Sequence, residues 1–313
     1  MIKVALIFGG PGKEHDVSLS SAKNILENVD RKLFDILEVL VTKDKKYQID
    51  NKIFDEDSGI EEIKKRGVEV IFPIIHGTYG EDGELQGKLE QVGITFVGSS
   101  SNVSSLTIDK NKTNRVLKEN GITIPKSKII TKDNNHISNF TYPIILKPVD
   151  EGSSVDLFKF ENEIEFNNKI DSIFKNHEEM LVQEFVKGRE FTCGVIKKDS
   201  ENFPLIATEV VLTKGELFDY EAKYTTGGCK EITPAEVDSV TMKRLQDVAV
   251  TCHKILGCKS ISRTDMILKD DNIYVLEINT VPGMTKTSFV PQQAKACGCD
   301  MKDLITLLIN SAV

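Results

Sequence analysis

Polar side chains interrupt a strand-like segment near the C-terminal end of the chain. The segment YVLEINTVPGMTKTS begins at Tyr274, and it carries Glu277 and Asn279 where a buried strand would carry apolar residues. Because side chains alternate along a strand, Val275, Glu277 and Asn279 are expected to share one face. A buried carboxylate without a partner is unfavourable, so we expect a charge partner opposite Glu277.

The preceding segment, ISRTDMILKDDN, predicts the partner strand of an antiparallel hairpin. Residues directly opposite each other in such a hairpin point to the same face. A three-residue loop, Asp270–Asn272, would place Asp265 opposite Glu277. The same register would place Arg263 opposite Asn279, whereas a two-residue loop would change the facing.

Two interpretations of this polar group remain open. Oxygen ligands from Asp265, Glu277 and Asn279 suit a hard cation, and so small a set suits Mg2+ or Mn2+ completed by water and substrate phosphates. Alternatively, Arg263 pairs with both acids in a structural ion network. Of the two, the oxygen-only ligand set favours the metal interpretation.

A metal ion that holds phosphates implies a nucleotide, and two other segments offer nucleotide contacts. In YPIILKPVDEGSSV, Lys147 ends an apolar strand just before the small residues Gly152-Ser153-Ser154. Such a loop lets N–H groups and hydroxyls approach phosphate oxygens, although a lone Gly-Ser-Ser is more often a plain turn. In LVQEFVKGREF, Glu184 and Glu190 could accept hydrogen bonds from adenine and ribose, or be ordinary exposed acids.

Two common nucleotide-binding signatures are missing from the sequence. No G-x-x-x-x-G-K-[ST] phosphate loop occurs, and the Gly9-Gly10 turn lacks the full G-x-G-x-x-G pattern. The absence of the second pattern argues against a dinucleotide-binding oxidoreductase.

The composition is that of an ordinary globular protein with an acidic balance. Of 313 residues, 40% are hydrophobic and 28% are charged, and the formal net charge is -8. An acidic surface is not attracted to phosphate backbones or acidic lipids, so we expect no nucleic-acid and no membrane partner. The N-terminal MIKVALIFGG is expected to be a first strand and not a secretory signal, which predicts a cytoplasmic protein with six ordinary thiols.

Three regions with different patterns follow one another along the chain. Residues 1–100 alternate strand and helix patterns, which predicts a parallel sheet with ligand-binding loops at the carboxyl ends of its strands. The polar segment Gly98–Ser105 then leads into a helix and a smaller α+β unit, residues 101–189. Residues 190–313 carry longer strand patterns, a long helix and the hairpin. The expected fold is therefore α/β with three domains.

Several segments together resemble the D-alanine-D-alanine ligases of the ATP-grasp superfamily. In chain order they are IFGGPGKEHDVSLSSA, IIHGTYGEDGELQGKLE, TIDKNKT, KPVDEGSSV, FDYEAKY, SRTDMIL and LEINTVPGMTKTS. The resemblance covers essentially the whole chain. It implies an ATP-grasp fold in which two α+β domains clamp ATP. It also implies ATP-dependent joining of two D-alanines through an acyl phosphate, for peptidoglycan synthesis.

The resemblance further implies roles for residues at matching motif positions. Around the nucleotide, it implies phosphate contacts from Lys110, Lys147 and Lys223, adenine and ribose contacts from Glu184 and Glu190, and two Mg2+ ions bound by Asp265, Glu277 and Asn279. For the first D-alanine, it implies that Glu14, linked to Ser153 and Tyr224, binds the ammonium group and that His76 lies nearby. For the tetrahedral species, it implies that Arg263 and the Gly283 N–H stabilise the oxyanion. For the second D-alanine, it implies a pocket formed by Ser288 and Phe289.

The chain departs from the family pattern at three positions. Asp156 stands where the loop G-S-S-V-G usually ends in glycine, so either its side chain points away from the triphosphate or nucleotide affinity is reduced. Phe289 replaces a commoner leucine and could reshape the second-substrate pocket. Gln183 replaces an acid often found before Glu184, which leaves the adenine contact open between these two positions.

Alternative functions stay open at this point. Tyr224 favours an amino acid over a hydroxy acid as second substrate, but D-serine remains an alternative to D-alanine. A non-catalytic nucleotide-binding homologue is another, with Asp156 as its lesion, although the retained Arg263 and its acidic neighbours argue against it. The resemblance also implies a homodimer and a mobile cover formed by FDYEAKYTTGG.

Overall fold

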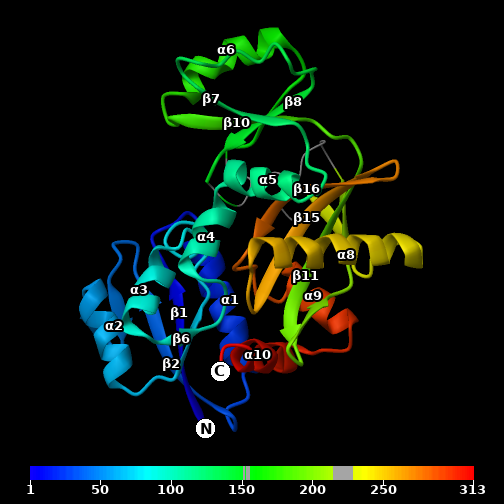
Figure 1. Cartoon of the computed structure of the whole chain (residues 1–313). Coiled ribbons are helices and arrows are strands. Elements are labelled where there is room, and N and C mark those ends of the chain that lie inside the picture. The colour runs from blue at the N-terminus through cyan, green and yellow to red at the C-terminus, as the bar shows by residue number, and fades with distance from the viewer. Residues whose placement is uncertain (151, 153–155, 214–227) are drawn as a thin grey trace.

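The chain forms three sheets that follow one another along the sequence, with helices packed on their faces (Figure 1). The structure is a computed structural model and describes residues 1–150, 152, 156–213 and 228–313. It confirms the expected three-part α/β fold with a parallel N-terminal sheet. Among the helices described, none is both long enough and apolar enough to cross a membrane.

The first part of the chain builds a sheet with helices around it. Its elements are β1 (Ile2–Gly9), α1 (His15–Asn28), β2 (Phe34–Val41), β3 (Tyr47–Ile49), β4 (Lys52–Phe54), α2 (Glu56–Lys65), β5 (Val70–Pro73), α3 (Glu84–Val92) and β6 (Thr95–Phe96).

The strand order of this N-terminal sheet is β4-β3-β2-β1-β5-β6. β1 pairs in parallel with both β2 and β5. Every residue of β5 is buried, as expected for a continuous apolar strand covered on both faces. Because β1 and β5 are parallel neighbours, their carboxyl ends meet at one edge of the sheet. The loops that leave this edge carry Glu14 and His76.

Two short helices connect this sheet to the rest of the chain, α4 (Ser101–Ile108) and α5 (Lys110–Glu119). The polar segment Gly98–Ser105, expected to precede the first helix of this region, is itself helical from Ser101 onward. The serine-rich sequence has modest helix propensity, and tertiary packing overrides it: Ser104 and Thr107 are buried.

The central sheet consists of β7 (Ser127–Thr131), β8 (Ile144–Pro148), β9 (Phe158–Phe160) and β10 (Glu179–Glu184), with α6 (Glu163–Ile173). The strand order is β7-β10-β8-β9. Phe166 and Ile170 of α6 pack into one apolar cluster with Leu146 and Val182 of the strands. The register pairs Leu181 with Lys147 and Gln183 with Ile145. Lys147 and Gln183 therefore lie on the face that α6 does not cover.

The last part of the chain builds the third sheet and its helices. Its elements are β11 (Arg189–Lys198), β12 (Glu201–Pro204), β13 (Thr208–Leu212), β14 (Cys229–Ile232), α8 (Ser239–Leu256), β15 (Ile261–Lys269), β16 (Asn272–Asn279), α9 (Phe289–Ala296) and α10 (Met301–Asn310).

The strand order of this C-terminal sheet is β14-β13-β11-β15-β16, and β12 pairs with β11. The long helix α8 crosses one face of it (Figure 1). Leu245, Ala249 and Cys252 of α8 share a core cluster with Val275 and Ile278 of β16. The opposite face is left to polar side chains, including those of Asp265 and Glu277.

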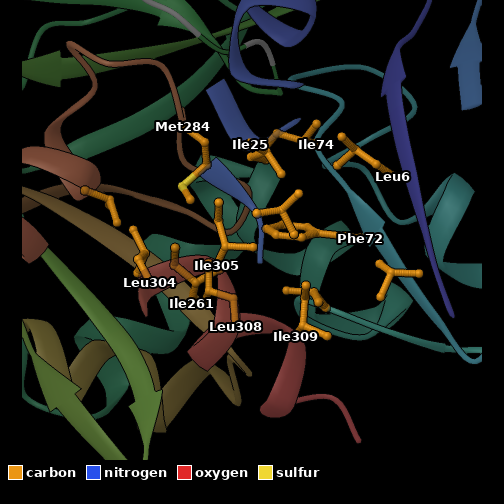
Figure 2. Packing of buried hydrophobic residues seen from close by; sticks show 14 of the residues in the cluster. Leu6, Ile25, Phe72, Ile74, Ile261, Met284, Leu304, Ile305, Leu308 and Ile309 are labelled. Carbon is orange, nitrogen blue, oxygen red and sulfur yellow. The ribbon is translucent and has the colours of Figure 1, made fainter. Parts of the chain in front are cut away.

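A further apolar cluster joins the two ends of the chain. It includes Ile25 of α1, Ile74 after β5, Met284 after β16 and Leu304 of α10. Figure 2 shows these side chains packed together. The segment that follows β16 is therefore anchored on the N-terminal sheet as well as on its own.

Candidate functional site

One cavity of about 470 Å3 is lined by residues from both the N-terminal and the C-terminal sheets. The predicted site residues on its wall are Glu14, His76, Arg263, Glu277, Asn279, Gly283, Ser288 and Phe289. They come from segments more than 200 residues apart in the sequence, such as Glu14 and Ser288. The fold thus gathers most of the predicted amino-acid contacts around a single space.

The hairpin of β15 and β16 places Asp265 opposite Glu277, as expected, but by a different route. Lys269 pairs with Asn272, so the loop has two residues and the three-residue loop expected from the sequence is wrong. The register then shifts between Met266 and Asp265. This β-bulge, one extra residue on β16, restores the facing that the shorter loop would have lost.

The same bulge changes which residues share a face of β16. Simple alternation would put Val275 on the side of Glu277, and that expectation is wrong. Ile273, Val275 and Ile278 are all buried in the core cluster under α8. The extra residue interrupts the alternation of side chains along β16. Glu277 and Asn279 therefore face the cavity, whereas Val275 and Ile278 face the core.

Arg263 forms a bidentate ion pair with Asp265 inside the site. Nε donates to Oδ1 at 2.9 Å and a terminal nitrogen donates to Oδ2 at 2.7 Å. Thr192 Oγ1 also donates to Oδ1 at 2.6 Å, and Asn279 Nδ2 donates to Oδ2 at 3.2 Å. Burial would lower the pKa of the guanidinium, but the Asp265 and Glu277 carboxylates outweigh this and raise it. Arg263 is therefore a fixed positive charge.

The donor set at this position suits a hard cation in part. Among the described residues, no group of three or more His, Cys, Asp or Glu side chains could hold a metal. Two carboxylates and one amide are nevertheless enough for Mg2+, which keeps waters and phosphate oxygens in its shell. Asp265 already accepts four hydrogen bonds, the longest from Asn279. Turning the Asn279 amide over would free that position and present Oδ1, because amide orientation follows the local network.

Glu14 is the N-cap residue of α1, and its side chain makes no capping hydrogen bond. Its carboxylate oxygen Oε2 lies between two glycines. A Cβ built on Gly152 would lie 3.1 Å from this oxygen, and one on Gly77 would lie 3.2 Å from it. Both contacts are tight, so a side chain at either position would crowd the carboxylate.

Lys110 lies at a second, narrower pocket next to the main cavity. This pocket is lined by Lys110, Gly152, Glu277 and Asn279, among others. The lysine is buried at the first turn of α5, and its backbone N–H bonds the carbonyl of Val149 at 2.9 Å. The helix start is thus tied to the loop after β8, which brings a cation near the predicted metal ligands.

Three further predicted nucleotide contacts that lie in the described part of the chain do not line the cavity. Lys147 lies on β8, Glu184 ends β10 and Glu190 lies near the start of β11. Gln183 is buried, and its Nε2 has no hydrogen-bond partner among the residues that the structure describes. An unpaired buried donor on the face that carries Lys147 fits a missing acceptor such as a nucleotide base. Ser153, Lys223 and Tyr224 lie outside the described residues.

Asp156 adopts a left-handed backbone conformation with φ of 52°, a region that glycine occupies with less strain than aspartate. Its carboxylate Oδ2 lies 3.1 Å from His177 Nε2 and 3.8 Å from Lys13 Nζ. Of the two expectations, the structure therefore supports a side chain engaged elsewhere, with its charge offset in part by Lys13.

Two acids in the cavity were missed at the sequence level. Glu81 is buried and accepts hydrogen bonds from the N–H groups of Gly77 at 2.8 Å and Val281 at 3.2 Å. Burial, and then the nearby Glu14, raise the pKa of Glu81 to about 8. The motif HGTYGEDG contained it, but only His76 was singled out there. Glu231 on β14 is raised in pKa by burial, and it accepts a hydrogen bond from Gln292 at 2.5 Å.

Phe289 lies beside Arg263, and Ser288 lines the same cavity. The guanidinium carbon of Arg263 lies 5.5 Å from the centre of the Phe289 ring, within cation–π range. Ser288 Oγ bonds the N–H of Thr285 at 3.0 Å and Thr285 Oγ1 at 2.7 Å. The aromatic ring thus supports the arginine and closes one wall of the pocket.

Comparison with known proteins gives one consistent result. A family model described as the D-ala D-ala ligase N-terminus matches residues 3–99, and one described as the D-ala D-ala ligase C-terminus matches residues 103–310. The D-alanine--D-alanine ligase of Leptospira biflexa is 38% identical, with 99% of this chain and 98% of that protein covered. D-alanine--D-alanine ligase A of Escherichia coli is 32% identical, with 100% and 96% covered.

Solved structures agree with the sequence relatives. The VanG D-Ala:D-Ser ligase from Enterococcus faecalis has a TM-score of 0.86 and 32% identity, and the comparison covers 100% of this chain and 99% of that one. The D-alanine--D-alanine ligase from Bacillus anthracis complexed with ATP has a TM-score of 0.83 and 25% identity, with 100% and 97% covered. The chain therefore belongs to the D-alanine-D-alanine ligase family, with its ATP-grasp fold.

Proposed function

We propose that this protein joins two D-alanines into D-alanyl-D-alanine at the expense of ATP, for peptidoglycan synthesis. The observation that carries the proposal is the single cavity shared by Glu14, Arg263, Glu277, Gly283 and Ser288. An acid for an ammonium, a fixed cation and a metal-binding acid are the groups that such a ligation needs in one place.

In the first step, the carboxylate of the first D-alanine attacks the γ-phosphate of ATP and forms an acyl phosphate and ADP. No covalent bond to the protein is needed, so the side chains act by positioning and by offsetting charge. Glu14 holds the ammonium, linked to Ser153 and Tyr224, and His76 lies beside this substrate. Lys110 offsets phosphate charge.

The other nucleotide contacts belong to the same proposal. They are phosphate contacts from Lys147 and Lys223 and adenine and ribose contacts from Glu184 and Glu190. The unpaired Nε2 of Gln183 supports an additional hydrogen bond to the base.

Asp265, Glu277 and Asn279 are proposed to bind two Mg2+ ions, with Mn2+ as a substitute. When bound, the ions offset negative charge on the transferring phosphoryl group. The support is the shared face of these three side chains and the turnable amide of Asn279. Arg263 holds Asp265 in place through its two hydrogen bonds.

In the second step, the amine of the second D-alanine attacks the acyl carbon, and phosphate leaves from the tetrahedral species. Arg263 and the N–H of Gly283 stabilise the negative oxygen of that species. Ser288 binds the carboxylate of the second amino acid, and Phe289 forms a wall of its pocket.

The three proposed domains are residues 1–100, 101–189 and 190–313. The protein is proposed to be a cytoplasmic homodimer.

An assay of ADP and dipeptide formation tests the proposal directly. With ATP, Mg2+ and D-alanine, we expect equal amounts of ADP and D-alanyl-D-alanine, and chelation of the metal should abolish both. ATP binding without turnover would contradict the proposal and favour a non-catalytic homologue.

D-serine as second substrate is the specific alternative, because the VanG structure of similar fold is a D-Ala:D-Ser ligase. Adding D-serine to the same assay separates the two. Efficient formation of the mixed dipeptide, with little D-alanyl-D-alanine when both amino acids are present, would overturn the D-alanine specificity and leave the ligase reaction intact.

A further inference from the structure

The short segment Val281–Met284 carries Gly283, and its backbone is held from the N-terminal half of the chain. The carbonyl of Val281 accepts a hydrogen bond from His76 Nδ1 at 2.9 Å, and its N–H donates to Glu81 Oε1 at 3.2 Å. The N–H of Met284 donates to Ser21 Oγ at 3.2 Å, and its carbonyl accepts from Asn24 Nδ2 at 2.8 Å. Both peptide groups flanking Pro282-Gly283 are therefore fixed.

The direction of each hydrogen bond in this group follows from its neighbours. Since the Val281 carbonyl can only accept, His76 Nδ1 carries the proton. Burial lowers the pKa of His76, so the ring is neutral and its Nε2 accepts from the Ser21 hydroxyl at 3.2 Å. Ser21 Oγ can then accept the N–H of Met284. The result is one ordered chain of donors and acceptors with no conflict.

Asn24 is oriented in the same way. Asn28 Nδ2 donates to Asn24 Oδ1 at 3.2 Å, which turns Asn24 Nδ2 toward the Met284 carbonyl. Asn24 and Ser21 are buried on α1 and do not line the cavity. Their side chains can therefore influence the reaction only by holding the segment Val281–Met284.

Apolar contacts support the same attachment. Met284 is almost fully buried in the cluster that contains Ile25 of α1 and Leu304 of α10, as Figure 2 shows. The ring of Pro282 restricts its own φ, so little freedom remains between the two fixed ends. The direction of the Gly283 N–H is consequently set by side chains of α1 and of the loop after β5.

We infer that Asn24 and Ser21, together with Glu81 and His76, are positioning residues that aim the Gly283 N–H at the oxygen of the tetrahedral species. This inference rests on the proposed function of Gly283. A misplaced donor weakens amide formation more than acyl-phosphate formation, because the N–H is needed only in the second step. The acyl phosphate then has time to be hydrolysed.

The test replaces Asn24 by leucine, which has a similar size and no donor. In Asn24→Leu, we expect the kcat for dipeptide formation to fall at least about tenfold, since loss of an oxyanion donor costs 100- to 1000-fold. The KM for ATP should stay within about twofold, because the nucleotide contacts are elsewhere. The ratio of ADP released to dipeptide formed should rise from about one to above about two.

Asn114→Leu is the matched control. Asn24 and Asn114 are both 5% exposed, and Asn114 also joins two elements, through Nδ2 to Ser127 Oγ at 3.3 Å. A general loss of stability would affect both variants, whereas only Asn24→Leu should change the ADP-to-dipeptide ratio. Ser21→Ala removes a single hydroxyl and provides the second variant, with the same expected change in ratio, if Asn24→Leu does not fold.

The outcomes separate this inference from the proposed function. If the unmodified protein releases ADP without dipeptide, the proposed function fails. If the unmodified protein couples the two and Asn24→Leu, or Ser21→Ala in its place, keeps both kcat and the ratio within twofold, the positioning role alone is refuted. A fall in kcat with an unchanged ratio would also refute it, because that result indicates a general structural effect.

Discussion

Replacing Gly283 by alanine should separate the two roles proposed for the loop after β16. The backbone does not require glycine here, because Gly283 is not among the residues with positive φ. The obstacle is a side chain: a Cβ on Gly283 would lie 2.7 Å from Ser288 Oγ. Alanine keeps the N–H, so the proposed oxyanion contact survives while the serine has to move.

The size of the effect follows from what holds Ser288. Oγ would have to retreat from 2.7 Å to the 3.4 Å at which ordinary contact begins. It is held by the N–H of Thr285 at 3.0 Å and by Thr285 Oγ1 at 2.7 Å, and the movement strains or breaks both bonds. One or two lost hydrogen bonds correspond to about 1–2 kcal/mol. We therefore expect the KM for the second amino acid to rise about tenfold.

A double-mutant cycle with Ser288→Ala provides the assay. The KM of each D-alanine is measured from dipeptide formation in Gly283→Ala, in Ser288→Ala and in the double variant. Since Ser288→Ala removes the atom that the new methyl group meets, adding Gly283→Ala to it should raise KM by less than about twofold. Additive effects of the two substitutions would refute this explanation. So would a large rise in the KM for ATP.

Three other outcomes are expected. Burial lowers the pKa of His253 to about 4, so the unfolded state binds more protons than the folded state between pH 6.5 and 4. As the pH falls through this range, the free energy of unfolding measured by urea titration should decrease by up to about 3 kcal/mol. His253→Gln should make the free energy of unfolding less dependent on pH over the same range. Asp156→Gly should change the KM for ATP by less than about threefold, because the Asp156 carboxylate is engaged with His177. A tenfold lower KM for ATP in this variant would show instead that the Asp156 charge weakens binding of the triphosphate. Arg263→Lys should lower the kcat for dipeptide formation about 10- to 100-fold, since lysine cannot form the bidentate pair with Asp265, and a kcat within twofold of the unmodified protein would argue against that pair.

The local patterns of the sequence were sufficient for the general plan of the protein. Alternating strand and helix patterns predicted the parallel N-terminal sheet, and β2 begins and ends where its apolar pattern does, at Phe34 and Val41. Glu277 and Asn279 on one strand predicted a polar face. These features depend on residues close together in the chain, whose periodicity and burial can be inferred without any tertiary contact.

The geometry of the site depended on contacts that no local pattern contains. The loop of the hairpin is shorter than predicted, and the bulge before Glu277 compensates for it. Nothing in the alternation of β16 indicated that Val275 and Ile278 would both turn inward. The packing of α8 selects that arrangement, because it buries both apolar side chains on one face.

The sequence by itself determined which chemical groups are present, their order and the three-part α/β fold. Only the tertiary structure decided how they meet. Asn24 and Met284 are 260 residues apart, and so are not linked by any sequence period, yet one hydrogen bond joins them. Likewise, no local sequence pattern indicates that Glu81 is buried and accepts a hydrogen bond from the N–H of Val281. Long-range packing of the two ends of the chain fixes these pairs, because a buried polar group must find its partner wherever the fold brings one.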